Sequence, residues 1–284
     1  MHFGASTFIW VSPFSNKTIG LVKKVHEMGF DLIEICIEDP STIDPPRIKE
    51  ALEENAIGAT VCGAFGLDRD ASSEDDRVRG NAAQYLNKCI DIAAELGSPL
   101  VAGPMYAATG KTRLLSRDER AKQWALAVET LKPVAEYGER RGVRLAVEPL
   151  NRFETDFINT VEQGLDLLDQ IGSSNVGFLL DTFHMNIEEK DIPGAIRQAG
   201  SKVFHFHSCE NDRGTPGTGH VEWEGVVSAL GAIDYLGPVV IEAFTTEITE
   251  IAKAVSLWRP LAPDQDSLAR DGLRFLRDVF QRKS

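Results

Sequence analysis

Short apolar runs alternate with longer amphipathic stretches along the chain, and a glycine stands just before most of the runs. Such a glycine can take the left-handed conformation that ends a helix, after which the chain turns into a strand. The glycines that fit this pattern are Gly29, Gly97, Gly142, Gly172, Gly200 and Gly237. The pattern predicts eight strands, at Phe3–Ile9, Leu32–Ile37, Ile57–Cys62, Leu100–Ala102, Val143–Glu148, Val176–Asp181, Val203–His207 and Val239–Glu242.

The stretches between these runs have the periodicity of amphipathic helices. We expect helices over Ala82–Leu96, Ser116–Arg141 and Leu268–Phe280, and polar loops at Asp39–Pro46 and Asp68–Asp76. Repeated alternation of strand and helix is typical of an α/β fold, here a parallel sheet closed into a (β/α)8 TIM barrel. A doubly wound open sheet is the alternative, but it usually carries a GxGxxG turn after the first strand, which this chain lacks. No linker or low-complexity segment interrupts residues 1–284, so we expect a single domain.

Composition argues against nucleic-acid-binding, membrane and secreted proteins. The hydrophobic fraction of 43% and the charged fraction of 26% are those of an ordinary globular protein, and the net charge of −13 argues against nucleic acid as the main partner. No apolar stretch reaches membrane-spanning length, and the first residues do not resemble a secretion signal. The four cysteines are far apart, with no CxxC motif. We therefore expect a reduced protein of the cytoplasm that has no membrane partner.

Four ionisable side chains each close one of four consecutive apolar runs: Glu148, Asp181, His207 and Glu242. The gaps between them are 33, 26 and 35 residues, about the length of one strand-plus-helix unit. The carboxyl ends of barrel strands surround a single pocket, so we expect the four groups to converge there. Any one of them alone would be an ordinary strand-end residue. Together, three carboxylates and one imidazole predict a site for one divalent cation such as Mn²⁺, Co²⁺ or Mg²⁺.

Such a site indicates carbonyl chemistry. A divalent cation that holds a substrate carbonyl and its neighbouring hydroxyl makes the adjacent C–H more acidic and stabilises an enediolate. Because Glu148 and Glu242 come from different strands, one can remove a proton and the other can return it on the opposite face. The residues expected to bind substrate follow the same strands: Glu154, His184 and Arg213. We place His205 in the barrel interior behind the cation and keep His220 as a further candidate for the pocket wall.

Four stretches carry a resemblance to a known family: Glu148–Glu154, Asp181–Asn186, His205–Gly219 and Ile241–Phe244. With them the chain resembles the xylose-isomerase-like sugar isomerase/epimerase superfamily. Within it, the chain is similar to the D-tagatose 3-epimerase group, which includes the D-psicose (D-allulose) and L-ribulose 3-epimerases. The resemblance extends over essentially the whole chain, including Trp258-Arg259-Pro260 before the final helix.

The resemblance implies an isomerase that inverts C3 of a free ketose through a cis-enediolate. It implies one divalent cation, Mn²⁺ in the first place and Co²⁺ or Mg²⁺ otherwise, on the four residues named above. It implies that Glu148 and Glu242 are the acid/base pair and that Glu154, His184 and Arg213 hold the O1–O3 end of the sugar. It also implies a homodimer or homotetramer. For the far end of the sugar we expect an apolar wall made by Phe8, Trp10, Met105, Tyr106 and Phe244.

Other functions remain open at this point. A phosphorylated ketose or other keto-polyol would suit the glycine-rich loop Arg213–His220, although acidic residues stand beside Arg213 and no lysine does. An aldose–ketose isomerase would use similar metal chemistry. Metal-dependent DNA hydrolysis on a related barrel needs several zinc ions and many histidines, and the chain has only six His. A sugar-binding protein without activity would not need a complete acid/base pair.

Overall fold

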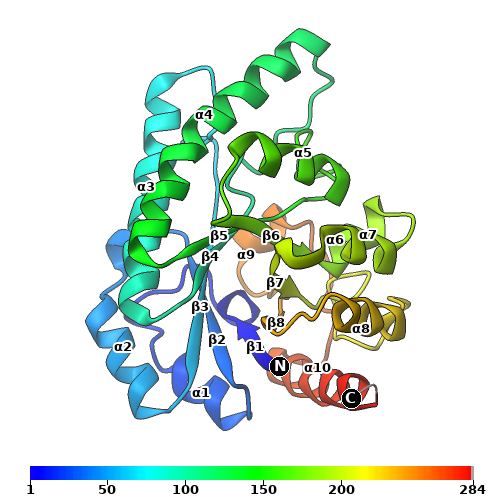
Figure 1. Ribbon diagram of the computed structural model, residues 1–284. Coiled ribbons are helices and arrows are strands. Elements are labelled where there is room, and N and C mark those ends of the chain that lie inside the picture. The colour runs from blue at the N-terminus through cyan, green and yellow to red at the C-terminus, as the bar shows by residue number, and fades with distance from the viewer. Residues whose placement is uncertain (283–284) are drawn as a thin grey trace.

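The structure, a computed structural model, describes residues 1–282, so the expected domain limit at residue 284 lies outside the described residues. Eight strands pair in parallel and close into a barrel in chain order (Figure 1). The strands are β1 (His2–Ser6), β2 (Leu32–Ile37), β3 (Gly58–Gly63), β4 (Leu100–Gly103), β5 (Arg144–Val147), β6 (Val176–Asp181), β7 (Val203–His207) and β8 (Pro238–Ile241). Pairing of β8 with β1, for example of Val239 with Phe3, confirms the TIM barrel and excludes the open sheet.

Ten α-helices surround the strands within residues 1–282. They are α1 (Leu21–Glu27), α2 (Pro45–Glu54), α3 (Asp76–Leu96), α4 (Arg117–Arg141), α5 (Val161–Ile171), α6 (Thr182–Glu188), α7 (Ile192–Ala199), α8 (Trp223–Ala232), α9 (Thr249–Ala254) and α10 (Gln265–Gln281). Figure 1 shows α1, α2 and α3 along one flank of the barrel and α7, α8 and α10 along the other. The last helix packs beside the first strand, where the rings of Phe3 and Phe280 meet edge to face at 5.5 Å.

Most predicted elements are present, with shifted ends. The first strand stops at Ser6 and not at Ile9, because Thr7–Ile9 form a 3-10 turn whose Phe8 N–H donates to the Ser6 hydroxyl. The helix expected from Ala82 already begins at Asp76, where the side chain of Asp75 caps it. The segment 39–46 is not only loop, since it contains a 3-10 turn at Pro40–Thr42 and the start of α2.

Five of the six glycines predicted at helix ends take a positive φ there, and Gly29 and Gly200 do so after α1 and α7 with φ angles of 93° and 58°. Gly97, Gly142 and Gly172 follow α3, α4 and α5 with φ angles of 73°, 70° and 72°. These angles lie in the left-handed region, which glycine enters without a steric cost. Gly237 does not play this part, because Asp234 takes the positive φ after α8.

The barrel interior holds a second, smaller core beside the main one between sheet and helices. Inward-facing residues of successive strands fill it, as in other barrels of this kind. Midway along the strands the interior also holds buried polar side chains, which include Glu34 of β2, Thr60 of β3 and His205 of β7. The polar layer lies directly beneath the pocket that the strand ends surround.

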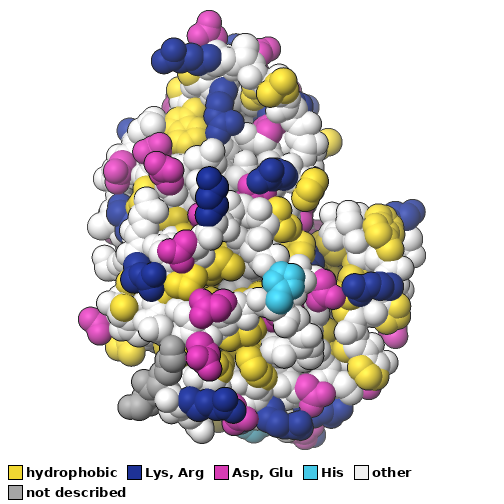
Figure 2. All heavy atoms as spheres, turned by 90° about the vertical axis from the view of Figure 1, so that its right-hand side faces the viewer, with side chains coloured by type: hydrophobic (Ala, Val, Ile, Leu, Met, Phe, Trp, Pro, Cys, Tyr) yellow, Lys and Arg dark blue, Asp and Glu magenta, His cyan; other side chains and the backbone are white. Residues whose placement is uncertain are grey.

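Within residues 1–282, none of the helices combines the length and the apolar character that crossing a bilayer requires. The face drawn in Figure 2 carries acidic and basic side chains interspersed with apolar ones and shows no continuous basic patch. This mixed distribution agrees with the net charge of −13.

Candidate active site and metal centre

The four residues expected to hold a cation come together at the carboxyl end of the barrel. Glu148 and Glu242 directly follow β5 and β8, while Asp181 and His207 are the last residues of β6 and β7. Their ligand atoms all lie within 4.8 Å of one another, and all four side chains are buried. Nδ1 of His207 lies 3.6 Å from Asp181 Oδ2 and 3.7 Å from Glu242 Oε1.

Three carboxylates held this closely repel one another unless a cation or a proton stands between them. Burial raises the pKa of Glu148 well above its ordinary value, and the charges of Glu242 and Asp181 raise it further. Burial also opposes ionisation of Asp181, but His207, His184 and Arg213 outweigh it and hold the pKa of that carboxyl well below its usual range. Of these two carboxyls, Glu148 is therefore the one that ionises less readily.

The donor set fits a divalent cation. Both ring nitrogens of His207 are buried and have no hydrogen-bond partner, and Nδ1 faces the carboxylates of Asp181 and Glu242. On its other side, Nε2 of His207 lies 2.9 Å from Oε1 of Glu34. An imidazole with a carboxylate behind one nitrogen and the other nitrogen turned to the ligand cluster is the usual arrangement of a histidine ligand. The four residues could therefore hold one ion with oxygen and nitrogen donors.

The three expected substrate-binding residues form one connected group beside the cation cluster. The guanidinium of Arg213 lies 2.9 Å from Glu154 Oε1 and 3.3 Å from Glu242 Oε2. It also lies over the ring of Phe183, 4.0 Å from its centroid, and 4.9 Å from that of Phe244. Arg213 has a φ angle of 66°, which is unusual for a residue with a side chain and fixes how the guanidinium enters the pocket.

His184 presents a hydrogen-bond donor to the pocket. Its Nδ1 accepts the backbone N–H of Asn151 at 3.0 Å, which leaves the ring proton on Nε2. Nε2 lies 3.7 Å from Oε1 of Glu148 and 3.5 Å from a guanidinium nitrogen of Arg213. Burial and the charge of Arg213 lower the pKa of His184, so the ring is neutral near neutral pH.

A cavity of about 470 Å³ opens over these groups. The predicted residues that line it are Phe8, Glu148, Glu154, His184, Arg213, Glu242 and Phe244. The rings of Phe8 and Phe244 lie 5.3 Å apart, so these two expected wall residues are confirmed. The prediction of an apolar wall was wrong for Trp10, Met105 and Tyr106, which do not line the cavity. Met105 and Tyr106 are fully buried in the main core, where the Tyr106 hydroxyl donates to the carbonyl of Ile158.

In the glycine-rich loop after β7, a buried carboxylate occupies N–H groups that could otherwise bind phosphate. Glu210 accepts the backbone N–H groups of Gly217 and Val221 and the indole N–H of Trp223, at 3.2, 3.0 and 2.9 Å. Backbone N–H groups of this kind are the donors that bind phosphate in many barrels. His220 at the end of the loop is exposed and does not line the cavity, so its place in the pocket wall was wrong.

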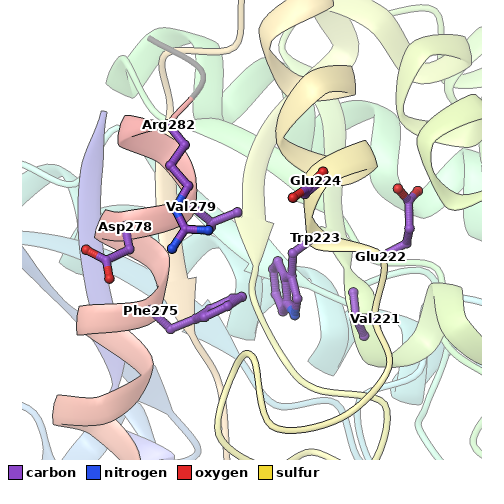
Figure 3. A pocket seen from close by; sticks show the side chains of 8 residues that line it. All are labelled: Val221, Glu222, Trp223, Glu224, Phe275, Asp278, Val279 and Arg282. Carbon is purple, nitrogen blue, oxygen red and sulfur yellow. The ribbon is translucent and has the colours of Figure 1, made fainter.

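A second hollow lies between α8 and α10, away from these groups (Figure 3). Its centre is apolar, with Trp223 and Phe275 facing each other at 5.8 Å. Figure 3 shows Glu222 and Asp278 turned away from each other on opposite sides of the hollow. Among residues 1–282, no group of ligand atoms converges there as it does at the strand ends, so the cavity above β5–β8 is the candidate active site.

Glu34 is the residue that sequence reasoning missed. It lies in the middle of β2, is completely buried, and contacts both His205 and His207. His205 is confirmed in the barrel interior behind the cluster, with Nε2 2.6 Å from Glu34 Oε2. The available signal was a lone carboxylate in the otherwise apolar run Leu32–Ile37, because a charge is rarely buried without a partner.

Comparison with known sequences decides the family. The sequence model of the family described as xylose isomerase-like TIM barrel matches residues 22–279. The chain belongs to this family. Its relatives within the family align over nearly full length: a probable ketose 3-epimerase of Synechocystis sp. is 38% identical, and the alignment covers 99% of this chain and 97% of the relative.

Solved structures agree with this membership of the xylose isomerase-like family. A structure of an L-ribulose 3-epimerase superposes with a TM-score of 0.93 at 33% identity, covering 99% of this chain and 95% of the other. A D-allulose 3-epimerase of Methylomonas sp. in complex with D-allulose superposes with a TM-score of 0.91 at 31% identity, covering 98% and 97%. The chain is therefore an enzyme of the isomerase class within this family.

Proposed function

We propose that the protein is a 3-epimerase of free ketoses that depends on one divalent cation. The observation that carries the proposal is the buried cluster of Glu148, Asp181, His207 and Glu242, of which Glu148 and Glu242 line the cavity together with Arg213 and His184. Relatives named as ketose and L-ribulose 3-epimerases support the reaction class. When bound, the cation would polarise the substrate carbonyl and its neighbouring oxygen, which acidifies the C–H bond at C3.

In this proposal Glu148 and Glu242 transfer the proton. They directly follow strands β5 and β8, which are not neighbours in the barrel, yet their carboxylate oxygens lie within 4.8 Å of each other. A sugar carbon above the cluster would have one carboxylate on each side. One carboxylate takes the proton from C3 and the other returns a proton to the opposite face, so the configuration inverts without a net change in composition.

Arg213, His184 and Glu154 would hold the carbonyl end of the ketose. Arg213 and the Nε2–H of His184 would donate hydrogen bonds to substrate oxygens, and the carboxylate of Glu154 would accept a hydrogen bond from a substrate hydroxyl. Asn151 holds this group in place: its side-chain amide donates to Oε1 of Glu154 at 2.9 Å, and its backbone N–H donates to Nδ1 of His184. The substrate-binding side chains are therefore arranged before substrate arrives.

A free ketose suits the cavity better than a phosphorylated one. The backbone donors of the loop after β7 are already taken by Glu210, and Arg213 is matched by Glu154 and Glu242. A phosphate dianion there would face three carboxylates. Among free ketoses we propose D-allulose, D-fructose, D-tagatose and L-ribulose, with Mn²⁺ as the first choice of cation and Co²⁺ or Mg²⁺ next. The catalytic unit is the single barrel spanning the chain.

The test is a panel assay in D₂O. The protein, stripped of metal and reloaded with Mn²⁺, Co²⁺ or Mg²⁺, is incubated with each of the four ketoses and with their phosphates. NMR should show loss of the C3 proton together with appearance of the C3 epimer. An aldose–ketose isomerase would instead exchange hydrogen at C1 or C2. Faster turnover of the phosphates, or full activity in the presence of a strong chelator, would contradict the proposal.

A further inference from the structure

We infer that Glu34 is a positioning residue of the metal centre: it fixes the His207 ring so that Nδ1 faces the cation. The inference deepens the proposed function, because it rests on the proposed cation site, but it requires nothing of the substrate. Glu34 contacts neither the cavity nor the expected substrate, so any effect on the reaction passes through His207.

Glu34 joins two histidines from a strand that is not next to theirs. It lies on β2, whereas His205 and His207 lie on β7. Its Oε2 lies 2.6 Å from Nε2 of His205 and its Oε1 lies 2.9 Å from Nε2 of His207. The hydroxyl of Thr60 on β3 donates to Oε2 at 3.3 Å. All four side chains are completely buried, so each oxygen of Glu34 meets a nitrogen of a different ring.

This arrangement decides which nitrogen of His207 is turned to the cation. A carboxylate is an acceptor only, so with a cation in the cluster the ring proton of His207 belongs on Nε2, which lies 2.9 Å from Oε1 of Glu34. His207 then has its lone pair on Nδ1, which faces Asp181 and Glu242. A neutral imidazole with its proton held by a carboxylate is the form that binds a metal ion, and the carboxylate also raises the basicity of the ligand nitrogen.

His205 would keep Glu34 itself in place. The rings of His205 and His207 meet edge to face at 5.0 Å, and Nδ1 of His205 has no hydrogen-bond partner. A buried histidine with one ring nitrogen lacking a hydrogen-bond partner adds little to the free energy of unfolding, because the unpaired nitrogen has a desolvation cost. Its contact with Oε2 instead prevents the Glu34 carboxylate from rotating away from His207.

The experiment measures cation binding in the full-length protein without any ketose. Wild type and the Glu34→Gln variant are stripped of metal and titrated with Mn²⁺ and with Co²⁺ by equilibrium dialysis, and the visible absorption of bound Co²⁺ is recorded. Glutamine has one acceptor oxygen, so it cannot accept from both rings. We expect cation affinity to fall about 10- to 100-fold, as for other partners of histidine ligands, and the Co²⁺ spectrum to change.

The matched control is Asp70→Asn, which removes another buried carboxylate, paired with Lys111 at 2.6 Å and remote from the histidines. It should lower thermal stability and leave cation affinity and the Co²⁺ spectrum as in wild type. If Glu34→Gln does not fold, His205→Gln takes its place, with an expected loss of several-fold in affinity. Unchanged affinity and spectrum in whichever of these two variants folds would overturn the inference. Because no ketose is present, that result would leave the proposed epimerase activity untouched.

Discussion

Glu148 and Glu242 have different neighbours although both end in the same cluster. Glu148 faces the neutral ring of His184 at 3.7 Å, whereas Glu242 faces the guanidinium of Arg213 at 3.3 Å. Burial and the neighbouring carboxylates raise the pKa of Glu148. A pair of carboxyls in unequal surroundings can supply an acid and a base at one pH.

The first prediction concerns these two carboxylates. Glu148→Gln and Glu242→Gln should each lower kcat by about 10²- to 10⁴-fold, because each removes a proton-transfer group and one oxygen ligand. The measurement is the rate of C3 deuterium exchange with D-allulose at saturating Mn²⁺. Circular dichroism and the melting temperature serve as the check that each variant is folded. Near-normal exchange in either folded variant would remove that carboxylate from the mechanism.

The second prediction concerns Arg213. Burial tends to raise the pKa of Glu154, but Arg213, His184 and Asn151 outweigh it and lower that pKa. A carboxyl with a lowered folded-state pKa adds stability above its unfolded value and loses it as the pH falls. Arg213→Ala should therefore cost on the order of 3 kcal/mol of unfolding free energy near neutral pH and clearly less below the ordinary carboxyl range.

Arg152→Ala is the matched control for Arg213→Ala. Arg152 also pairs with a glutamate, Glu188, but its side chain is 61% exposed. Its loss should change stability by no more than about 1 kcal/mol. Urea unfolding at two pH values measures both variants, and a stability loss in Arg213→Ala that does not depend on pH would contradict the assigned role of Glu154.

For single residues, the sequence predicts the proposed metal ligands better than the residues that hold those ligands in place. Glu148, Asp181, His207 and Glu242 recur at one strand position, so chain periodicity alone brings them together. Glu34 acts on His207 from a strand that is three places away around the barrel. Nothing in the spacing along the chain indicates that contact, because it depends on how the barrel closes and on which side chains point inward.

Among the elements, the close approach of β6 to the start of β7 depends on a glycine. A Cβ on Gly177 of β6 would lie 2.4 Å from the backbone carbonyl of Lys202 and 2.6 Å from the ring of Phe204. The carbonyl belongs to the backbone that leads into β7, the strand that ends in His207. The tight approach of β6 to β7 therefore belongs to the framework that carries two of the proposed ligands.

The third prediction compares two glycines. Gly177→Ala should lower the unfolding free energy by about 1–3 kcal/mol, because the added methyl group overpacks the sheet. Gly80→Ala is the matched change inside α3, where a Cβ would meet nothing within 4 Å, and it should add about 1 kcal/mol. Guanidinium unfolding measures both. If both substitutions change the unfolding free energy by the same amount and with the same sign, the close approach of β6 to β7 does not require a glycine at position 177.

Element ends were the weaker part of the sequence-based prediction, for identifiable reasons. The apolar run that begins at Phe3 continues to Ile9, yet Ser6 stops the strand by accepting the N–H of Phe8. In the same way, Asp75 starts α3 within a segment whose polar composition predicted a loop. A side chain that bonds its own backbone overrides hydrophobic periodicity, and such bonds are visible only once the chain is folded.

The molecule as a whole places a buried negative cluster at the mouth of a closed barrel, in a chain whose net charge is −13. Closure of β8 onto β1 brings Glu242 against Glu148 and Asp181. The barrel could be predicted from the sequence, because strand and helix patterns alternate eight times along the chain. The homo-oligomer and the cytoplasmic location stay predictions, because both depend on surfaces and signals that the strand pattern does not encode.

The fourth prediction follows from that cluster and concerns the whole fold. Without a cation, burial and the charges of Glu242 and Asp181 raise the pKa of Glu148, so the folded protein keeps a proton that the unfolded chain releases. A state that binds more protons loses stability as the pH rises, here from the ordinary carboxyl range up to the raised pKa. A divalent cation replaces that proton. The rise in melting temperature on adding Mn²⁺ should therefore be larger at about pH 7.5 than at about pH 5.5.

The Glu148→Gln variant is the control. It separates the loss of stability caused by the Glu148 proton from the pH dependence caused by protonation of the other metal ligands. Glutamine cannot ionise, so the cation-free variant should not lose stability over the same pH range through this position. Differential scanning calorimetry of wild type and variant, with and without Mn²⁺, supplies all four curves. If the cation-free wild type and the variant lose stability in parallel as the pH rises, Glu148 does not hold the proton. The charge of the cluster must then be balanced elsewhere, with Arg213, which already lies beside Glu242, as the nearest cationic group.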